Sequence, residues 1–219
     1  MIVQTTACVP FADVLDDLYG GIVKKTLAGH DREIAPIQSI PRSAAQLVYD
    51  TVRAVRPAVA VEVGMAWGFS SVAICSALRD NEHGINVVID PLQVSLWEGV
   101  ALASLDRLGL TQHARFEERR SDQFLPAFWE RENTRIQFAF IDGDHRADAV
   151  FMDFYYVNKL LDEGGIVILD DVQFESIASV VRFALRTFHY ESLPCSEERF
   201  AILRKVMDDD RGWEDYGQL

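Results

Sequence analysis

The feature that most limits the fold of this chain is a regular alternation of short apolar runs with longer segments of helical periodicity. The run 165–169 (GIVIL), like Val59–Val63 (VAVEV), is apolar at almost every position and too short for a helix. Such runs are typical of strands covered on both faces of a sheet. The intervening segments include one from Ile40, in which Leu47 and Val48 begin a helical apolar repeat. Alternating strands and helices form βαβ units, so we predict an α/β fold with a mostly parallel sheet.

The pattern divides the chain into expected elements. Strands are expected at Val59–Val63, Asn86–Ile89, Ala114–Glu118, Ile136–Ile141, Gly165–Leu169, Tyr190–Leu193 and Phe200–Lys205. Helices are expected at 40–55, Ser70–Leu78, Val94–Leu108, Ser121–Trp129, Ala147–Leu161 and Ser176–Phe188, with weaker helical pieces at Phe11–Tyr19 and Gly21–Leu27. The short polar stretch PCSEER joins the last two strands, which predicts an antiparallel hairpin at a sheet edge.

Three parts follow from this pattern. Residues 1–40 are expected to cover the mouth of a site or to contact a partner subunit, because they are too few for an independent core. Residues 41–205 are expected to form the α/β domain, and residues 206–219 an acidic tail. We also expect a homo-oligomer.

The charge of the chain limits its partners. The formal net charge is -13 at pH 7 and the isoelectric point is about 4.7. A chain this acidic repels phosphate backbones, so we expect no nucleic-acid partner. The N-terminus lacks a basic region followed by an apolar run, and no apolar stretch is long enough for a membrane span, so we expect a cytoplasmic protein without a membrane partner.

A glycine-containing turn follows the first strand of the predicted sheet. The segment EVGMAWGFSS holds Glu62, Gly64, Gly68 and Ser70. Glycines there permit a tight turn, and the following helix begins with free N–H groups. The GxGxxG pattern of nicotinamide dehydrogenases would need glycine where Ala66 stands, which disfavours that class. A plain turn between strand and helix remains the alternative.

Acidic residues follow three further strands. Asp90 ends the second strand, where it either accepts hydrogen bonds from a ribose diol or opens a turn. Asp142 follows a later strand, and Asp170 and Asp171 follow the next one. If those two strands are neighbours, about 4.8 Å apart, their three carboxylates repel one another unless a cation neutralises them or they protonate. We expect Mg²⁺ there, because every ligand is a hard oxygen, with helix caps as the alternative.

A possible proton acceptor stands in the same stretch, I-D-G-D-H. His145 begins the next helix and titrates near neutral pH, which suits a general base. Asp144 precedes it.

These motifs together resemble the class I methyltransferases, which use S-adenosylmethionine. VEVGMAWGFSS matches the glycine-rich motif of that family, and FAFIDGDHRADAVFMDFYYVNKLLDEGGIVILDDV resembles small-molecule O-methyltransferases of the macrocin and mycinamicin type. The resemblance covers about residues 40–205. It implies a Rossmann-like, seven-stranded, mostly parallel sheet with a C-terminal antiparallel hairpin.

The resemblance also implies site residues. Cofactor contacts are expected from Glu62, Gly64, Gly68, Ser70, Asp90, Ser121, Asp122 and Asp142. Asp90 would hold the ribose hydroxyls, and Asp122 the exocyclic amine of adenine. Asp142, Asp170 and Asp171 match the metal ligands of magnesium-dependent members. The base would be His145 or Asp144.

The expected activity is therefore methyl transfer to a hydroxyl of a small molecule, with S-adenosylmethionine and Mg²⁺ as cofactors. Two alternatives remain open at this point. One is a methyltransferase without a metal, in which Asp170 and Asp171 are structural caps. The other is a protein that binds the cofactor without performing chemistry.

Overall fold

A seven-stranded sheet forms the centre of the molecule, and its strands lie in the order β5-β4-β3-β6-β7-β9-β8. The structure is a computed structural model that describes residues 9–34, 38–132, 134–212 and 214. The strands of the large sheet are β3 (Val59–Val63), β4 (Ile85–Ile89), β5 (Ala114–Glu117), β6 (Ile136–Ile141), β7 (Leu161–Leu169), β8 (Tyr190–Leu193) and β9 (Ala201–Lys205). β3 to β7 pair in parallel, whereas β9 pairs antiparallel with both β7 and β8. The predicted fold and C-terminal hairpin are confirmed.

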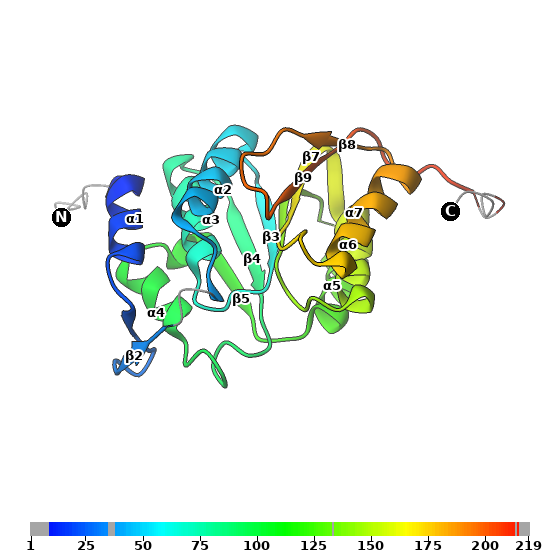
Figure 1. Ribbon diagram of the computed structural model, residues 1–219. Coiled ribbons are helices and arrows are strands. Elements are labelled where there is room, and N and C mark those ends of the chain that lie inside the picture. The colour runs from blue at the N-terminus through cyan, green and yellow to red at the C-terminus, as the bar shows by residue number, and fades with distance from the viewer. Residues whose placement is uncertain (1–8, 35–37, 133, 213, 215–219) are drawn as a thin grey trace.

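Helices cover both faces of the sheet (Figure 1). They are α1 (Phe11–Tyr19), α2 (Arg42–Val55), α3 (Phe69–Asp80), α4 (Val100–Arg107), α5 (Ser121–Glu132), α6 (Ala147–Leu160) and α7 (Glu175–Thr187). The apolar side chains of α1 to α4 belong to one core cluster, and those of α5 to α7 to a second cluster across the sheet. Every residue of α3 from Phe69 to Leu78 is buried, which explains why that segment shows little amphipathic pattern.

The N-terminal segment joins the main core. α1 buries Phe11, Val14, Leu15 and Leu18 in the cluster that contains α2 and α3. A two-stranded hairpin of β1 (Val23–Lys25) and β2 (Asp31–Glu33) follows it.

Two helix predictions were wrong. The predicted helix over Gly21–Leu27 is part of the hairpin, because β1 pairs with β2, a contact that helical periodicity does not reveal. The helix predicted from Val94 begins only at Val100, because Glu98 and Gly99 have φ of 52° and 68°, in the left-handed region. Residues 91–99 therefore form a series of turns that connects β4 to α4.

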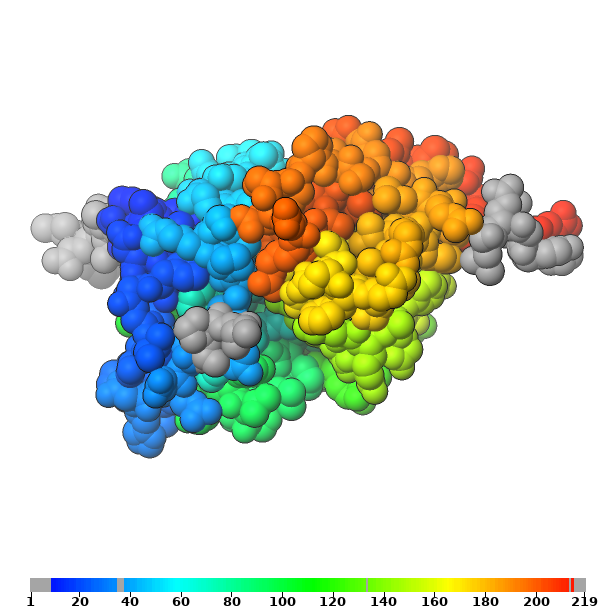
Figure 2. Space-filling model, viewed as in Figure 1, coloured from blue at the N-terminus to red at the C-terminus, as the bar shows by residue number. Residues whose placement is uncertain are grey.

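The carboxyl ends of β3, β4, β6 and β7 meet at one edge of the sheet. β6 and β7 are direct neighbours, as the acidic strand ends required. In Figure 2 the surface recedes beside the residues near the start of α7 (yellow). Within the described ranges, no helix has the length and apolar character that crossing a bilayer would need.

Candidate functional site

The turn after β3 needs glycine at two positions. Gly64 has φ of 89°, and a Cβ there would lie 2.0 Å from the carbonyl oxygen of Asp142. Gly68 has φ of 83°, and a Cβ there would lie 2.5 Å from the Cβ of Ala101. Both glycines therefore let the turn pack closely against other parts of the chain, the Asp142 loop and α4. The sequence-based expectation invoked close approach to a ligand, and the structure adds this internal reason.

Asp90 fastens the same turn to the end of β4. Its Oδ2 accepts hydrogen bonds from the amides of Met65, at 3.0 Å, and Ala66, at 2.9 Å. Its Oδ1 accepts one from the amide of Leu92 at 2.7 Å. A carboxylate offers about four acceptor positions, so one remains. Asp90 thus lies beside the glycine-containing turn, where a ribose acceptor was expected, and also holds that turn in place.

Gln93 is a further residue of this loop, which no sequence motif indicated. Its side chain is fully buried, and its Nε2 donates to the carbonyl of Ala66 at 2.9 Å. Its Oε1 is buried and has no hydrogen-bond partner among the residues that the structure describes. Such an acceptor beside the turn suits a ligand that brings N–H or O–H donors, so the residues present fit a cofactor of that kind.

Glu62 and Ser70 lie beneath the turn. Glu62 is fully buried and accepts hydrogen bonds from Ser70 Oγ at 2.6 Å and from Asn86 Nδ2 at 2.7 Å. Burial raises the pKa of Glu62 to about 7, although these hydrogen bonds oppose the shift. Both predicted contact residues therefore use their side chains inside the protein, where they connect β3 to α3 and β4.

Ser121 and Asp122 begin α5, as expected. Both carboxylate oxygens of Asp122 accept from Arg120, at 2.9 Å and 2.7 Å for the two shortest contacts, and this pairing lowers the pKa of Asp122. Below them lies Asp153 of α6, which is 1% exposed. Burial raises its pKa to about 6, and a hydrogen bond with Ser121 partly opposes the shift.

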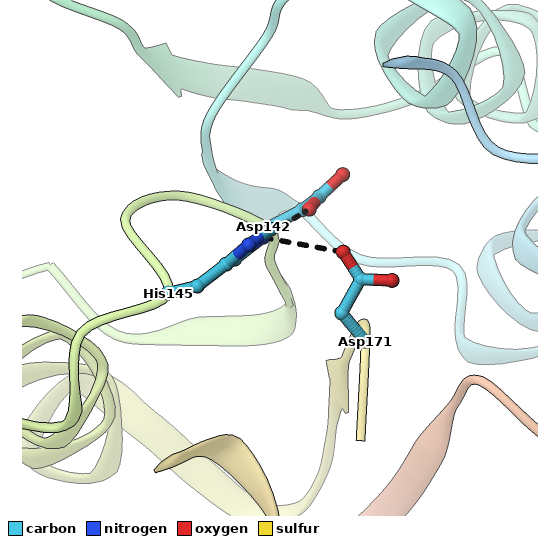
Figure 3. A group of neighbouring side chains, drawn as sticks. All are labelled: Asp142, His145 and Asp171. Atoms are coloured by element: carbon cyan, nitrogen blue, oxygen red, sulfur yellow. Dashed lines mark ion pairs between the residues drawn. The ribbon is translucent and has the colours of Figure 1, made fainter. Parts of the chain in front are cut away.

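His145 lies between two carboxylates (Figure 3). Its Nε2 is 3.2 Å from Oδ2 of Asp171 and 3.8 Å from Oδ1 of Asp142. The hydrogen bond with Asp142 and the charge of Asp171 raise the pKa of His145, while burial opposes the shift. The imidazole side chain is 44% exposed and contacts the ring of Phe174, with centroids 5.2 Å apart. Both of these carboxylate contacts are made through Nε2.

Asp144 is placed differently from His145. Its carboxylate accepts from the amide of Arg146 at 3.0 Å and from Nε of the same residue at 3.0 Å. These bonds close the turn before α6, so Arg146 occupies the carboxylate of Asp144 in this structure.

The three predicted magnesium ligands do not come together with free oxygens. The side chain of Asp170 is fully buried, and Arg199 donates to both of its oxygens, from Nε at 2.5 Å and from Nη2 at 2.7 Å. Arg199 Nη2 also lies 2.9 Å from Oδ1 of Asp171. The group that does converge is Asp142, His145 and Asp171, with ligand atoms within 4.8 Å of one another. This set has one nitrogen in place of the third hard oxygen, so the residues present do not fit the expected magnesium site.

Burial and neighbouring charges shift the pKa values of two of these carboxyl groups, Asp142 and Asp170. Burial, with the charge of Asp142, raises the pKa of Asp170 to about 7, although Arg199 opposes the shift. Desolvation also raises the pKa of Asp142, while His145 lowers it. Arg199 is the last residue of the polar loop PCSEER. That loop contains no recognisable motif, so sequence reasoning missed Arg199.

Comparison with known proteins places this geometry in a family. Residues 61–172, just over half of the chain, match the family described as a methyltransferase domain. No curated protein sequence is similar enough to count as a match.

Solved structures share the fold at low identity. The O-methyltransferase TomG from Streptomyces achromogenes, of tomaymycin synthesis and in complex with S-adenosylmethionine, has 18% identity and a TM-score of 0.65, over 78% of this chain and 83% of that chain. An O-methyltransferase from Bacillus cereus in complex with S-adenosylhomocysteine has 15% identity and a TM-score of 0.63, over 77% and 81%. A TDP-rhamnose 3'-O-methyltransferase of calicheamicin biosynthesis has 20% identity and a TM-score of 0.60, over 74% and 77%.

Proposed function

Because this chain belongs to the methyltransferase domain family, we propose that it transfers a methyl group from S-adenosylmethionine to a hydroxyl of a small molecule. One observation carries the proposal. The glycine-containing turn held by Asp90 and the imidazole of His145 lie at the same edge of one sheet, at the carboxyl ends of its strands. This edge is where ligands bind in open α/β sheets.

The cofactor proposal rests on the turn after β3. Gly64 and Gly68 line the methionine and ribose end, and the remaining acceptor position of Asp90 takes the ribose hydroxyls. Ser121 and Asp122 border the adenine. Glu62 and Ser70 support the turn from below, as their buried hydrogen bonds indicate. TomG and the Bacillus cereus enzyme, which share the fold, were solved with S-adenosylmethionine and S-adenosylhomocysteine.

His145 is the proposed general base. A neutral imidazole that carries its proton on Nε2, the nitrogen 3.2 Å from Asp171 Oδ2, has a lone pair on Nδ1 that accepts the proton of the acceptor hydroxyl as the oxygen attacks. S-adenosylmethionine supplies a methyl group already activated on a sulfonium sulfur, so the C–S bond breaks as the C–O bond forms. The protein therefore contributes mainly orientation of the two reactants and a place for the proton. Asp144 is the weaker candidate, because Arg146 occupies its carboxylate.

The N-terminal segment, residues 1–40, is proposed to select the acceptor. A cavity of about 150 Å³ lies between this segment and α3, lined by Leu18, Tyr19, Ile22, Ile34, Ser39 and Phe69. Phe69, which lines the cavity, directly follows Gly68 of the cofactor turn, so part of the cavity wall is next to that turn in the chain. Its lining is mostly apolar and aromatic, which favours an acceptor with an apolar ring or chain beside its hydroxyl.

Two measurements test the proposal. Calorimetry with S-adenosylhomocysteine should show binding, and radiolabelled S-adenosylmethionine should label members of a panel of phenols, sugars and polyols. Binding without transfer to any acceptor would favour a cofactor-binding protein without catalysis. Tight NAD binding with no S-adenosylhomocysteine binding would contradict the assignment.

A further inference from the structure

Three carboxylates of the candidate site lie close together, and their negative charge needs compensation. Asp142, Asp170 and Asp171 stand at the ends of two adjacent strands, and the side chains of Asp170 and Asp171 are only 0% and 13% exposed. Carboxylates this close and this buried require a positive partner. A divalent ion is one solution, and a guanidinium group is another.

Arg199 supplies such a partner in a fixed position. Its Nε and Nη2 each donate to one oxygen of Asp170, and Nη2 also reaches Asp171. The fork of a guanidinium matches the two oxygens of a carboxylate, which makes this pairing both strong and directional.

The backbone around Arg199 is also anchored. Its carbonyl accepts from the amide of Val172 at 3.0 Å, which ties the loop between β8 and β9 to the loop after β7. The next residue, Phe200, is 5% exposed and packs edge-on against Phe140 of β6. The backbone that carries the guanidinium group of Arg199 is therefore fixed by a hydrogen bond and by packing against the core.

These contacts occupy both oxygens of Asp170 and one oxygen of Asp171, which a divalent ion at the three aspartates would need. Both oxygens of Asp170 are bonded to Arg199, and Oδ1 of Asp171 accepts from Arg199 and, at 2.6 Å, from Gln173 Nε2. The other oxygen of Asp171 faces His145. A divalent ion at the three aspartates would have to displace these donors and lie beside a fixed positive charge.

We propose that Arg199 is the resident cation of this site and takes the place of a divalent metal. It neutralises Asp170 and holds Asp171 through one oxygen, so that the other oxygen of Asp171 faces the imidazole of His145. Arg199 is thus a positioning residue for His145, and methyl transfer proceeds without an added metal. The statement about transfer rests on the proposed function, whereas the statement about the cation does not.

The test uses Mn²⁺ as the probe, because its uptake can be followed by electron paramagnetic resonance without any methyl acceptor. Wild-type protein should show no stoichiometric Mn²⁺ binding, and its transfer activity should be unchanged in EDTA. Arg199→Met removes the charge and exposes the three carboxylates to a metal, so it should bind Mn²⁺ at least about tenfold more tightly than wild type. Its melting temperature should rise with added Mn²⁺. Arg204→Met is the matched control, because Arg204 is 50% exposed and pairs with Glu191 instead.

The outcomes separate the two proposals. Stoichiometric Mn²⁺ binding by wild type that Asp142→Asn or Asp171→Asn abolishes, or loss of transfer in EDTA, would overturn the role of Arg199 while leaving the methyltransferase assignment intact. A folded Arg199→Met variant with no gain in Mn²⁺ affinity would also overturn it. If no acceptor is ever methylated, the Mn²⁺ measurements still decide the question. If Arg199→Met does not fold, Mn²⁺ uptake by the wild-type protein alone decides between a guanidinium and a metal ion.

Discussion

The buried carboxyl group of Glu62 should make the stability of this protein fall as the pH rises from about 4.5 to about 7. Burial raises its pKa from 4.5 to about 7. The folded state therefore holds a proton between these values that the unfolded state releases, and stability is lost as the pH rises towards the folded pKa. A shift of this size corresponds to about 3 kcal/mol in total, of which about 2–3 kcal/mol falls between pH 5 and pH 8.

The substitution Glu62→Gln isolates this contribution. Glutamine keeps the shape of a protonated glutamate. Asn86 Nδ2 donates to Glu62 in the wild type, and rotation of the Asn86 amide by 180° would bring its Oδ1, which has no partner among the described residues, to accept from the glutamine amide. Urea unfolding of both proteins, followed by circular dichroism at several values from pH 5 to pH 8, gives the difference in free energy of unfolding. Wild type should lose about 2–3 kcal/mol relative to Glu62→Gln across that range.

A second variant checks the cause of the shift. The hydrogen bond from Ser70 favours the ionised form of Glu62, so Ser70→Ala should move the midpoint of the pH dependence to higher pH. A difference between wild type and Glu62→Gln that stays constant from pH 5 to pH 8 would refute the reasoning, because Glu62 would then be ionised in the folded protein throughout.

Three further predictions concern the site. Gly64→Ala should destabilise the protein by about 3 kcal/mol or more in urea unfolding. Gly109→Ala is the control: Gly109 has φ of 66° and no atom within 4 Å of the added Cβ, so this change should cost only about 1–2 kcal/mol. Equal losses for the two variants would contradict the close approach of Gly64 to Asp142. Asp90→Ala should weaken S-adenosylhomocysteine binding by about tenfold or more in calorimetry, and unchanged affinity would remove Asp90 from the cofactor site. His145→Ala should lower kcat by about 10²–10⁴-fold while Asp144→Asn changes it little, and the reverse result would assign the base to Asp144.

Local patterns in the sequence were enough for most of the sheet. β3 and β6 begin and end where the apolar runs do, because a strand buried on both faces must be apolar at most consecutive positions. Local patterns gave a wrong prediction at Gly21–Leu27. The strand β1 in that stretch forms by pairing with β2, and its sequence, VKK, contains no apolar run that would indicate a strand.

The candidate site divides in the same way. The sequence by itself determined that acidic residues follow β4, β6 and β7, and that glycines follow β3, since strand ends and turns are encoded by neighbouring residues. It also determined the methyltransferase family through those motifs.

Only the tertiary structure decided what balances the carboxylates. Asp170 and Arg199 meet because β9 lies next to β7 in the sheet, which brings the loop between β8 and β9 to the end of β7. No local sequence pattern predicts the contact between Asp170 and Arg199. From the sequence alone, Arg199 is indistinguishable from an ordinary charged residue of a polar loop. The choice between a metal ion and a guanidinium depends on distances of a few ångströms between distant segments, because electrostatic compensation of buried charge acts through space and not along the chain.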